Sequence, residues 1–298
     1  MAQLVIGSRG SKLALWQARH IEAQLQELGH ETRIEIIVTT GDKITDVALA
    51  QVGEKTATKG VFTKEIEEAL LDGRIDLAVH SLKDLPTELP EGLEIGMVPE
   101  REDPRDALVG KRLDELKPGD RIGTSSLRRA AQMRALQPQA EMLDIRGNVD
   151  TRLRKLDEGQ YDAILLAASG LKRLGLGDRI TQALEAEEMS SAVGQGALAI
   201  EIRSRDEATA SALAPLEHVA TRTAVEAERE LLRSLGGGCQ TPLGAHAVTN
   251  AGTVSLKAAI ISADGGTILR ASTEAADPLE AGRGAAKELL AAGAGDLL

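Results

Sequence analysis

The stretch LVIGSRGSKLALWQARHIEAQLQELGHETRIEIIVTT, residues 4–40, has the pattern of a strand, a helix and a second strand. Leu4–Ile6 is a short apolar run, residues 13–28 repeat apolar side chains at helical spacing, and residues 33–39 form another apolar run. Gly29 follows the helical segment, and glycine commonly ends helices. A strand–helix–strand unit predicts a parallel sheet with helices on its faces.

The same alternation continues to residue 98 and then restarts after a charged connector with two prolines, residues 99–104. A second connector, Gly194-Gln195-Gly196, precedes another apolar strand. We therefore predict an α/β protein with two lobes like those of periplasmic binding proteins, plus a small α+β C-terminal domain. The predicted boundaries are 1–98 with 197–216 for lobe 1, 103–192 for lobe 2 and 217–298 for the C-terminal domain. Two connectors between two lobes predict a hinge and a cleft.

Composition excludes several classes of protein. The net charge is −11 and the chain holds one Phe, one Trp and one Tyr, which argues against binding to nucleic acids or to anionic membranes. The sequence shows no signal peptide and no apolar run long enough to span a membrane, so we expect a cytoplasmic protein. No long apolar surface stripe is evident, so we expect a monomer. The single cysteine and the spacing of the histidines predict no metal site.

That cysteine lies in Gly236-Gly237-Gly238-Cys239-Gln240-Thr241-Pro242, directly after a predicted helix. The glycines and the proline predict an irregular loop that exposes the thiol. The simplest interpretation is a helix end with an incidental thiol, and the alternative is a functional Cys239.

Arginines gather in the predicted second lobe, where residues 121–173 hold ten Lys and Arg against six Asp and Glu. Arg128 and Arg129 follow Thr124-Ser125-Ser126 at a predicted helix start, where the helix dipole disfavours cations. Arg146-Gly147-Asn148 repeats this placement, with Arg152 one turn further on. A solvated basic face is the alternative, but two such helix starts favour an anion site.

Asp84 is a lone carboxylate after the strand predicted at residues 75–79. In an open parallel sheet, ligands bind beyond the carboxyl ends of strands, where residues 8–11 and 81–84 should both lie. Asp84 is therefore either a surface turn residue or an acid that handles protons. At this point a two-lobed sensor protein and a phosphate-handling transferase also remain open, although the first leaves Cys239 without a role and the second lacks a P-loop.

Taken together and in order, these motifs resemble the hydroxymethylbilane synthase family, also called porphobilinogen deaminases. The resemblance rests on motifs spread along nearly the whole chain: residues 7–17 (GSRGSKLALWQ), 59–62 (KGVF), 78–86 (AVHSLKDLP), 100–107 (EREDPRDA), 123–129 (GTSSLRR), 146–148 (RGN), 192–196 (AVGQG) and 236–239 (GGGC).

The resemblance implies a transferase that joins four porphobilinogen molecules head to tail, releases ammonia and then frees hydroxymethylbilane by hydrolysis, in haem biosynthesis. It implies a dipyrromethane cofactor joined by a thioether to Cys239, and Asp84 as the catalytic aspartate. It also implies that substrate and cofactor are bound by arginines and by neighbouring polar residues: Arg9, Ser11, Lys59, Ser81, Lys83, Thr124, Ser125, Ser126, Arg128, Arg129, Arg146, Gly147, Arg152, Arg173 and Gln195. An arginine-rich cleft in an acidic protein suits a product that gains two carboxylates with each pyrrole.

Overall fold

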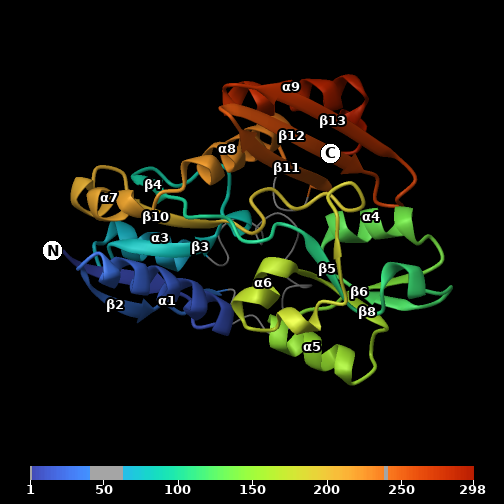
Figure 1. Ribbon diagram of the computed structural model, residues 1–298, viewed down its shortest axis with the longest axis horizontal. Helices are drawn as coiled ribbons and strands as arrows, with labels where there is room; N and C mark the ends of the chain where they lie inside the picture. Colours follow the sequence, from blue (N-terminus) through green and yellow to red (C-terminus); the bar gives the residue numbers. More distant parts are fainter. Residues whose placement is uncertain (1, 41–62, 238–240) are drawn as a thin grey trace. The chain divides into compact units, whose positions relative to one another are not determined.

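The computed structural model describes residues 2–40, 63–237 and 241–298 (Figure 1). The chain divides into two compact units: unit 1 is Met1–Arg101 with Ala197–Arg222, and unit 2 is Glu102–Gly196 with Thr223–Leu298. Unit 1 holds one five-stranded sheet, and unit 2 holds a second five-stranded sheet and a three-stranded sheet. The predicted fold class, two α/β lobes with a small α+β C-terminal domain, is confirmed. The three domain boundaries stay a prediction.

The first sheet has the strand order β2-β1-β3-β10-β4. Strands β1, β2 and β3 are parallel, and β10 runs antiparallel between β3 and β4. Leu77 and Val79 of β3 pack with α1, while Ala78 between them packs with α3, so helices cover both faces. Unit 1 contains β1 (Gln3–Ser8), α1 (Lys12–Glu27), β2 (Glu31–Ile36), α3 (Lys64–Leu71), β3 (Leu77–Ser81), β4 (Leu93–Met97), β10 (Leu198–Arg203) and α7 (Glu207–Leu213).

The second sheet has the order β7-β6-β8-β5-β9, with β5 antiparallel between β8 and β9. Met133 of α4 packs on one face, whereas Leu153 of α5 and Leu171 of α6 pack on the other. The elements are β5 (Asp106–Gly110), β6 (Arg121–Gly123), α4 (Leu127–Leu136), β7 (Glu141–Leu143), α5 (Val149–Asp157), β8 (Ala163–Ala167), α6 (Ala168–Arg173) and β9 (Gln182–Leu184).

The two five-stranded sheets are arranged alike, but only the first contains a strand from a later part of the chain. β5 is the first strand after the first connector, and β10 is the first strand after the second connector. Both take the fourth place in the strand order, but β5 comes from the same stretch of chain as β6–β9, whereas β10 returns from beyond the second sheet to complete the first. The connectors meet where the Glu102 amide donates to the Gly196 carbonyl at 3.2 Å. Gly196 has φ +88°, and a Cβ there would lie 2.3 Å from the Glu102 carbonyl oxygen, so only glycine fits.

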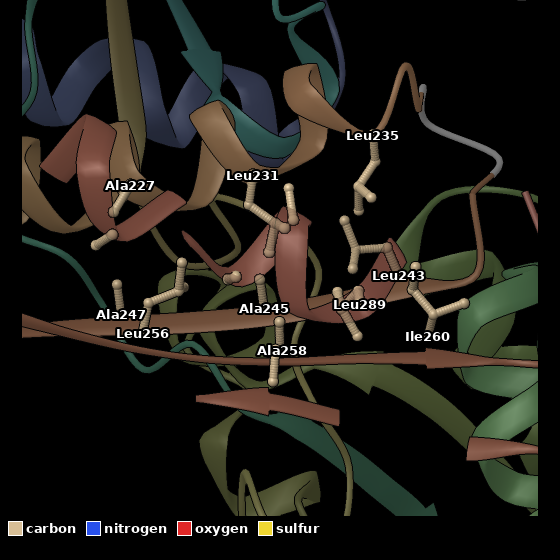
Figure 2. Packing of buried hydrophobic residues seen from close by; sticks show 14 of the residues in the cluster. Ala227, Leu231, Leu235, Leu243, Ala245, Ala247, Leu256, Ala258, Ile260 and Leu289 are labelled. Carbon is tan, nitrogen blue, oxygen red and sulfur yellow. The ribbon is translucent and has the colours of Figure 1, made fainter. Parts of the chain in front are cut away.

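The C-terminal part of unit 2 is an antiparallel sheet of three strands with helices on one face. In Figure 2, Leu231 of α8, Leu235 directly after that helix and Leu289 of α9 pack against alternate residues of β11 and β12. The opposite face contacts α4, because Ala259 and Ile261 pack with Ala131. The elements are α8 (Val219–Ser234), β11 (Leu243–Asn250), β12 (Thr253–Ile261), β13 (Ile268–Ala275) and α9 (Pro278–Ala291).

Candidate functional site

In unit 1, the carboxyl ends of β1 and β3 lie side by side, as expected for neighbouring parallel strands. The register pairs Ile6 with Leu77, and the Gln17 amide on α1 donates to Ser81 Oγ at 2.9 Å. Ser11 caps α1, since its hydroxyl accepts from the Ala14 amide at 3.3 Å. Arg9, one residue beyond β1, is half-buried. This edge therefore gathers the predicted residues Arg9, Ser11 and Ser81.

Asp84 closes a short 3₁₀ turn, Leu82–Asp84, directly after β3. The turn is fixed from both sides, because Leu82 and Leu85 are buried and the Leu82 amide donates to the Ala197 carbonyl at 3.0 Å. Asp84 itself is exposed, and Lys83 beside it is half-buried. A rigid turn therefore presents an accessible carboxylate at the carboxyl edge of the first sheet.

In unit 2, three hydroxyl residues join β6 to α4. The Thr124 amide donates to the Leu143 carbonyl of the neighbouring loop at 2.9 Å, and Thr124 Oγ1 accepts from the Ser126 amide at 3.2 Å. Ser126 caps α4 by accepting from the Arg129 amide at 3.4 Å. Ser125 is exposed between them. The caps fix where the first turn of α4 begins, and with it the two arginines.

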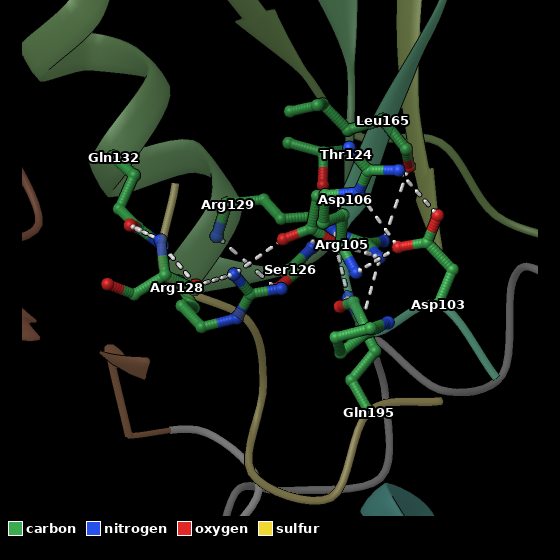
Figure 3. A network of polar contacts seen from close by, with 12 residues as sticks. Asp103, Arg105, Asp106, Thr124, Ser126, Arg128, Arg129, Gln132, Leu165 and Gln195 are labelled. Carbon is green, nitrogen blue, oxygen red and sulfur yellow. Dashed lines mark hydrogen bonds and ion pairs between the residues drawn. The ribbon is translucent and has the colours of Figure 1, made fainter. Parts of the chain in front are cut away.

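Arg128 and Arg129 are buried, and both contact the carboxylate of Asp106, the first residue of β5 (Figure 3). Arg128 Nη1 lies 2.7 Å from Asp106 Oδ2 and also donates to the Ser190 carbonyl. Arg129 Nη2 lies 2.7 Å from Asp106 Oδ1. The chain thus supplies its own anion at this helix start. Two guanidinium groups share that carboxylate, so a net positive charge remains.

The charges in this group influence one another strongly. Burial alone would raise the pKa of Asp106, but the charges of Arg128 and Arg129 outweigh it and hold that pKa well below its ordinary value. Burial lowers the pKa of Arg128, opposed by the charge of Asp106. An arginine with a lowered pKa is still protonated near neutrality, so the group stays cationic.

Gln195 and Arg173 tie the second connector to this group. The Gln195 amide nitrogen donates to Asp106 Oδ1 at 2.9 Å and to the Pro104 carbonyl at 2.7 Å. Arg173, at the end of α6, donates to the Gly196 carbonyl at 2.7 Å. Burial lowers the pKa of Arg173 to about 10, although the charge of Glu102 opposes the shift.

The start of α5 carries the remaining predicted residues. Gly147 has φ +110°, and a Cβ there would lie 2.8 Å from the Thr151 methyl carbon, which explains the glycine. Arg152 Nε donates to the Gly147 carbonyl at 2.7 Å, and Arg146 Nε pairs with Asp144 at 2.8 Å. Burial lowers the pKa of Arg152, and the nearby charge of Arg129 lowers it further, which places Arg152 within electrostatic range of the Asp106 group.

The structure therefore brings together Arg128, Arg129 and Gln195 directly, with Arg152 and Arg173 nearby, while Arg146 is paired separately with Asp144. Two further participants are Asp106 and Gln132, which exchanges hydrogen bonds with the backbone of Ser190 at 2.7 and 3.0 Å. Asp106 lies in the motif Pro104-Arg105-Asp106. The sequence around it gives no sign that it contacts Arg128 and Arg129, which follow 22 and 23 residues later.

Lys59 and Cys239 lie outside the described residues. The described flanks of Cys239 approach each other closely, because a Cβ on Gly237 would lie 2.7 Å from Thr241 Oγ1. The Gly237 amide also donates to the Leu232 carbonyl at 3.1 Å, which ties this flank to α8. The described residues on either side of Cys239 therefore lie close together beside the end of α8.

Within residues 2–40, 63–237 and 241–298, no cluster of three or more His, Cys, Asp or Glu side chains is placed to hold a metal ion. Over the same ranges, no helix combines the length and the apolar character required to cross a membrane.

Comparison with solved structures finds weak likenesses to periplasmic binding proteins. A methionine binding protein aligns over 72% of this chain and 89% of its own with a TM-score of 0.45 and 12% identity. An ABC transporter periplasmic substrate-binding protein from Coxiella burnetii aligns over 72% and 91%, with a TM-score of 0.44 and 13% identity.

Comparison of sequences is far more specific. Residues 4–211 match the family model of the porphobilinogen deaminase dipyrromethane cofactor binding domain, and residues 222–291 match the porphobilinogen deaminase C-terminal domain. A porphobilinogen deaminase from Thiobacillus denitrificans is 53% identical over 99% of this chain and 97% of its own. One from Chromobacterium violaceum is 52% identical over 100% and 97%. The ordered motifs, the two α/β sheets and these matches agree, and the chain belongs to the porphobilinogen deaminase family.

Proposed function

We propose that Asp84 is the catalytic acid of this hydroxymethylbilane synthase and that the arginines of unit 2 bind the carboxylates of its substrate and cofactor. Membership of the family makes the protein a transferase of tetrapyrrole biosynthesis, which acts on porphobilinogen with a dipyrromethane cofactor. It also decides against the sensor protein and the phosphate-handling transferase.

The observation that carries the proposal is the excess of buried positive charge at the start of α4. Arg128 and Arg129 share one carboxylate, Arg152 lies within electrostatic range of Arg129, and Arg173 donates to the backbone of Gly196, next to Gln195. Desolvated guanidinium groups with remaining charge favour carboxylate ligands, which they can bind through two parallel hydrogen bonds. A dipyrromethane carries several carboxylates, so the residues present fit it. When bound, the cofactor supplies the primer to which substrate units are joined.

Asp84 suits proton transfer because its turn is rigid and its carboxyl group is accessible. We propose that this group protonates the amino nitrogen of porphobilinogen as the carbon–nitrogen bond breaks and ammonia leaves. The carboxylate that results then stabilises the positive charge left on the substrate. Lys83 and Ser81, at the same edge, would position substrate carboxylates.

Cys239 is the proposed point of cofactor attachment. It is the single cysteine of the chain, and it completes the glycine motif at residues 236–239. Lys59 is a proposed binding residue on the strength of its motif alone. We also propose a cytoplasmic monomer, since the acidic chain disfavours anionic surfaces, and sedimentation at several protein concentrations would test the oligomeric state.

The intact mass of the purified protein tests the cofactor proposal. Protein made with porphobilinogen available should exceed the mass of the bare chain by two linked pyrrole units. Cys239→Ser should lack this excess because the hydroxyl forms no thioether, whereas Thr241→Ser, two residues away, should retain it. A wild-type mass equal to that of the bare chain would contradict the attachment.

A further inference from the structure

We propose that Asp106 is a positioning residue, which holds Arg128 so that one edge of its guanidinium group stays available for a substrate carboxylate. The inference rests on the proposed role of the arginines and adds a residue that does not itself touch substrate. Asp106 has no solvent exposure, so it can act only through its neighbours.

The two arginines are bonded unequally. Arg129 uses Nε and Nη2 on Asp106, Nη1 on the Leu165 carbonyl and Nη2 on Gln195. Arg128 bonds through Nη1 alone, to Asp106 and Ser190. In the part of the chain that the structure describes, neither Nε nor Nη2 of Arg128 donates to another residue. Arg129 therefore acts mainly within the protein, and Arg128 keeps the donors that a carboxylate ligand needs.

Asp106 is required because the arrangement is otherwise unfavourable. Two adjacent cations repel each other, both are desolvated, and both stand in the first turn of α4, where the helix dipole disfavours them. One carboxylate between them offsets these costs and leaves a net positive charge for a ligand. A neutral group at this position would leave both guanidinium groups without a counter-ion, and Arg128 would move to find another.

The topology brings this carboxylate to its place. β5 is antiparallel to β8, and Asp106 pairs with Ala167, the last residue of β8. The first residue of β5 therefore lies at the edge where the parallel strands β6 and β8 end and α4 begins. Asp103, three residues earlier, pairs instead with Arg105 and Lys172 at 2.9 Å each, which makes it a matched control.

The experiment compares Asp106→Asn with Asp103→Asn, using holoenzyme and porphobilinogen as substrate. Three quantities are measured: KM and kcat, the fraction of protein that carries cofactor by intact mass, and the thermal midpoint. We expect Asp106→Asn to raise KM about tenfold, which corresponds to one weakened charged contact, with a smaller effect on kcat. We also expect a lower cofactor fraction. Asp103→Asn should lower the thermal midpoint while KM and cofactor fraction stay close to wild type.

A double-mutant cycle with Arg128→Lys separates positioning from a general loss of stability. If Asp106 acts through Arg128, Asp106→Asn should raise KM little further in the Arg128→Lys background. Equal multiplicative effects in both backgrounds, or an unchanged KM and full cofactor loading in Asp106→Asn, would overturn the inference. If Arg128→Lys alone leaves KM unchanged, the proposed carboxylate binding by Arg128 fails instead.

Should Asp106→Asn not fold, Asp106→Glu keeps the charge and displaces both guanidinium groups by about one carbon–carbon bond length. A raised KM or a reduced cofactor fraction in folded Asp106→Glu supports the inference. Wild-type values for both would refute it.

Discussion

The two five-stranded sheets have equivalent strand arrangements, but side chains at corresponding positions are apolar in one and charged in the other. In each, the strand in second place, β1 or β6, leads through a polar turn to a capping serine, Ser11 in unit 1 and Ser126 in unit 2. Six residues beyond each serine stands a buried glutamine, Gln17 or Gln132. In both sheets the strand in fourth place begins opposite the last residue of its neighbour, at Leu198 of β10 and at Asp106 of β5.

The two sheets differ in side-chain type at three corresponding positions. Counted from the capping serine, Leu13 and Ala14 correspond to Arg128 and Arg129, and Leu198 corresponds to Asp106. Unit 1 thus has apolar side chains at the three positions where unit 2 has two arginines and an aspartate. The scaffold fixes where side chains can meet, and a few substitutions decide whether that place is apolar or binds anions. Unit 1 instead offers a carboxylate, Asp84, just beyond β3.

The largest expected effect comes from placing a carboxylate in unit 1 where unit 2 has one. Leu198→Asp would bury an unpaired charge, since Leu13 and Ala14 supply no cation, and should cost about 4 kcal/mol in the free energy of unfolding at neutral pH. Denaturant unfolding measures this, with Leu198→Asn as the uncharged control. Equal destabilisation of the two variants at neutral pH would contradict the prediction that unit 1 cannot accommodate a charge at this position.

Asp84→Asn tests whether unit 1 supplies the acid. Losing the proton donor should lower kcat by about a hundredfold or more while the thermal midpoint stays near wild type, because Asp84 is exposed. Asp72→Asn, which removes an exposed carboxylate elsewhere in unit 1, should leave kcat unchanged. Normal turnover in Asp84→Asn would remove the catalytic assignment.

A smaller effect concerns pH. Because the pKa of Asp106 is depressed in the folded protein, its ionic contribution is present above the unfolded value of 3.8 and is lost as the pH falls through the folded value. The stability advantage of wild type over Asp106→Asn should therefore shrink on acidification from about pH 5 to about pH 3. Thermal midpoints across this range measure it, since other carboxylates titrate equally in both proteins. A constant difference would show that Asp106 is not ionised as described.

The smallest effect tests what the sheets share. Ser11→Ala and Ser126→Ala each remove one capping hydrogen bond of similar length, 3.3 and 3.4 Å, and should each cost about 1 kcal/mol. Denaturant unfolding of both variants measures the difference. Costs that differ by more than about 1 kcal/mol would mean that one serine has a further structural role.

The fold could be read from the sequence where periodicity is strong. The predicted helix at residues 13–28, the predicted helix start after Ser126 and the parallel first pair of strands are confirmed. The strands β5 and β9 and the helices α6 and α7 were not predicted, because they are short and their pattern is not periodic. In addition, β5 begins directly after the charged connector, whose composition resembles a loop.

The site was predicted only in part. Motifs and charge placement indicated Arg128 and Arg129, but a pattern of neighbours along the chain cannot show that both are buried or that Asp106 lies between them. That contact depends on β5 pairing with β8, residues that are far apart in sequence. Local propensity carries no information about such pairing, which tertiary structure decides.

The return of β10 to the first sheet also constrains how the chain is made. β4 pairs with β10 alone in the first sheet, and β10 ends at Arg203. While the ribosome is still adding the second half, β3 and β4 are already synthesised and their facing edges have no partner. Unpaired strand edges favour aggregation, so the nascent chain is vulnerable until β10 emerges. Synthesis of the second half is therefore a step in the folding of the first, and a polypeptide truncated before residue 198 would lack the strand that closes its own sheet.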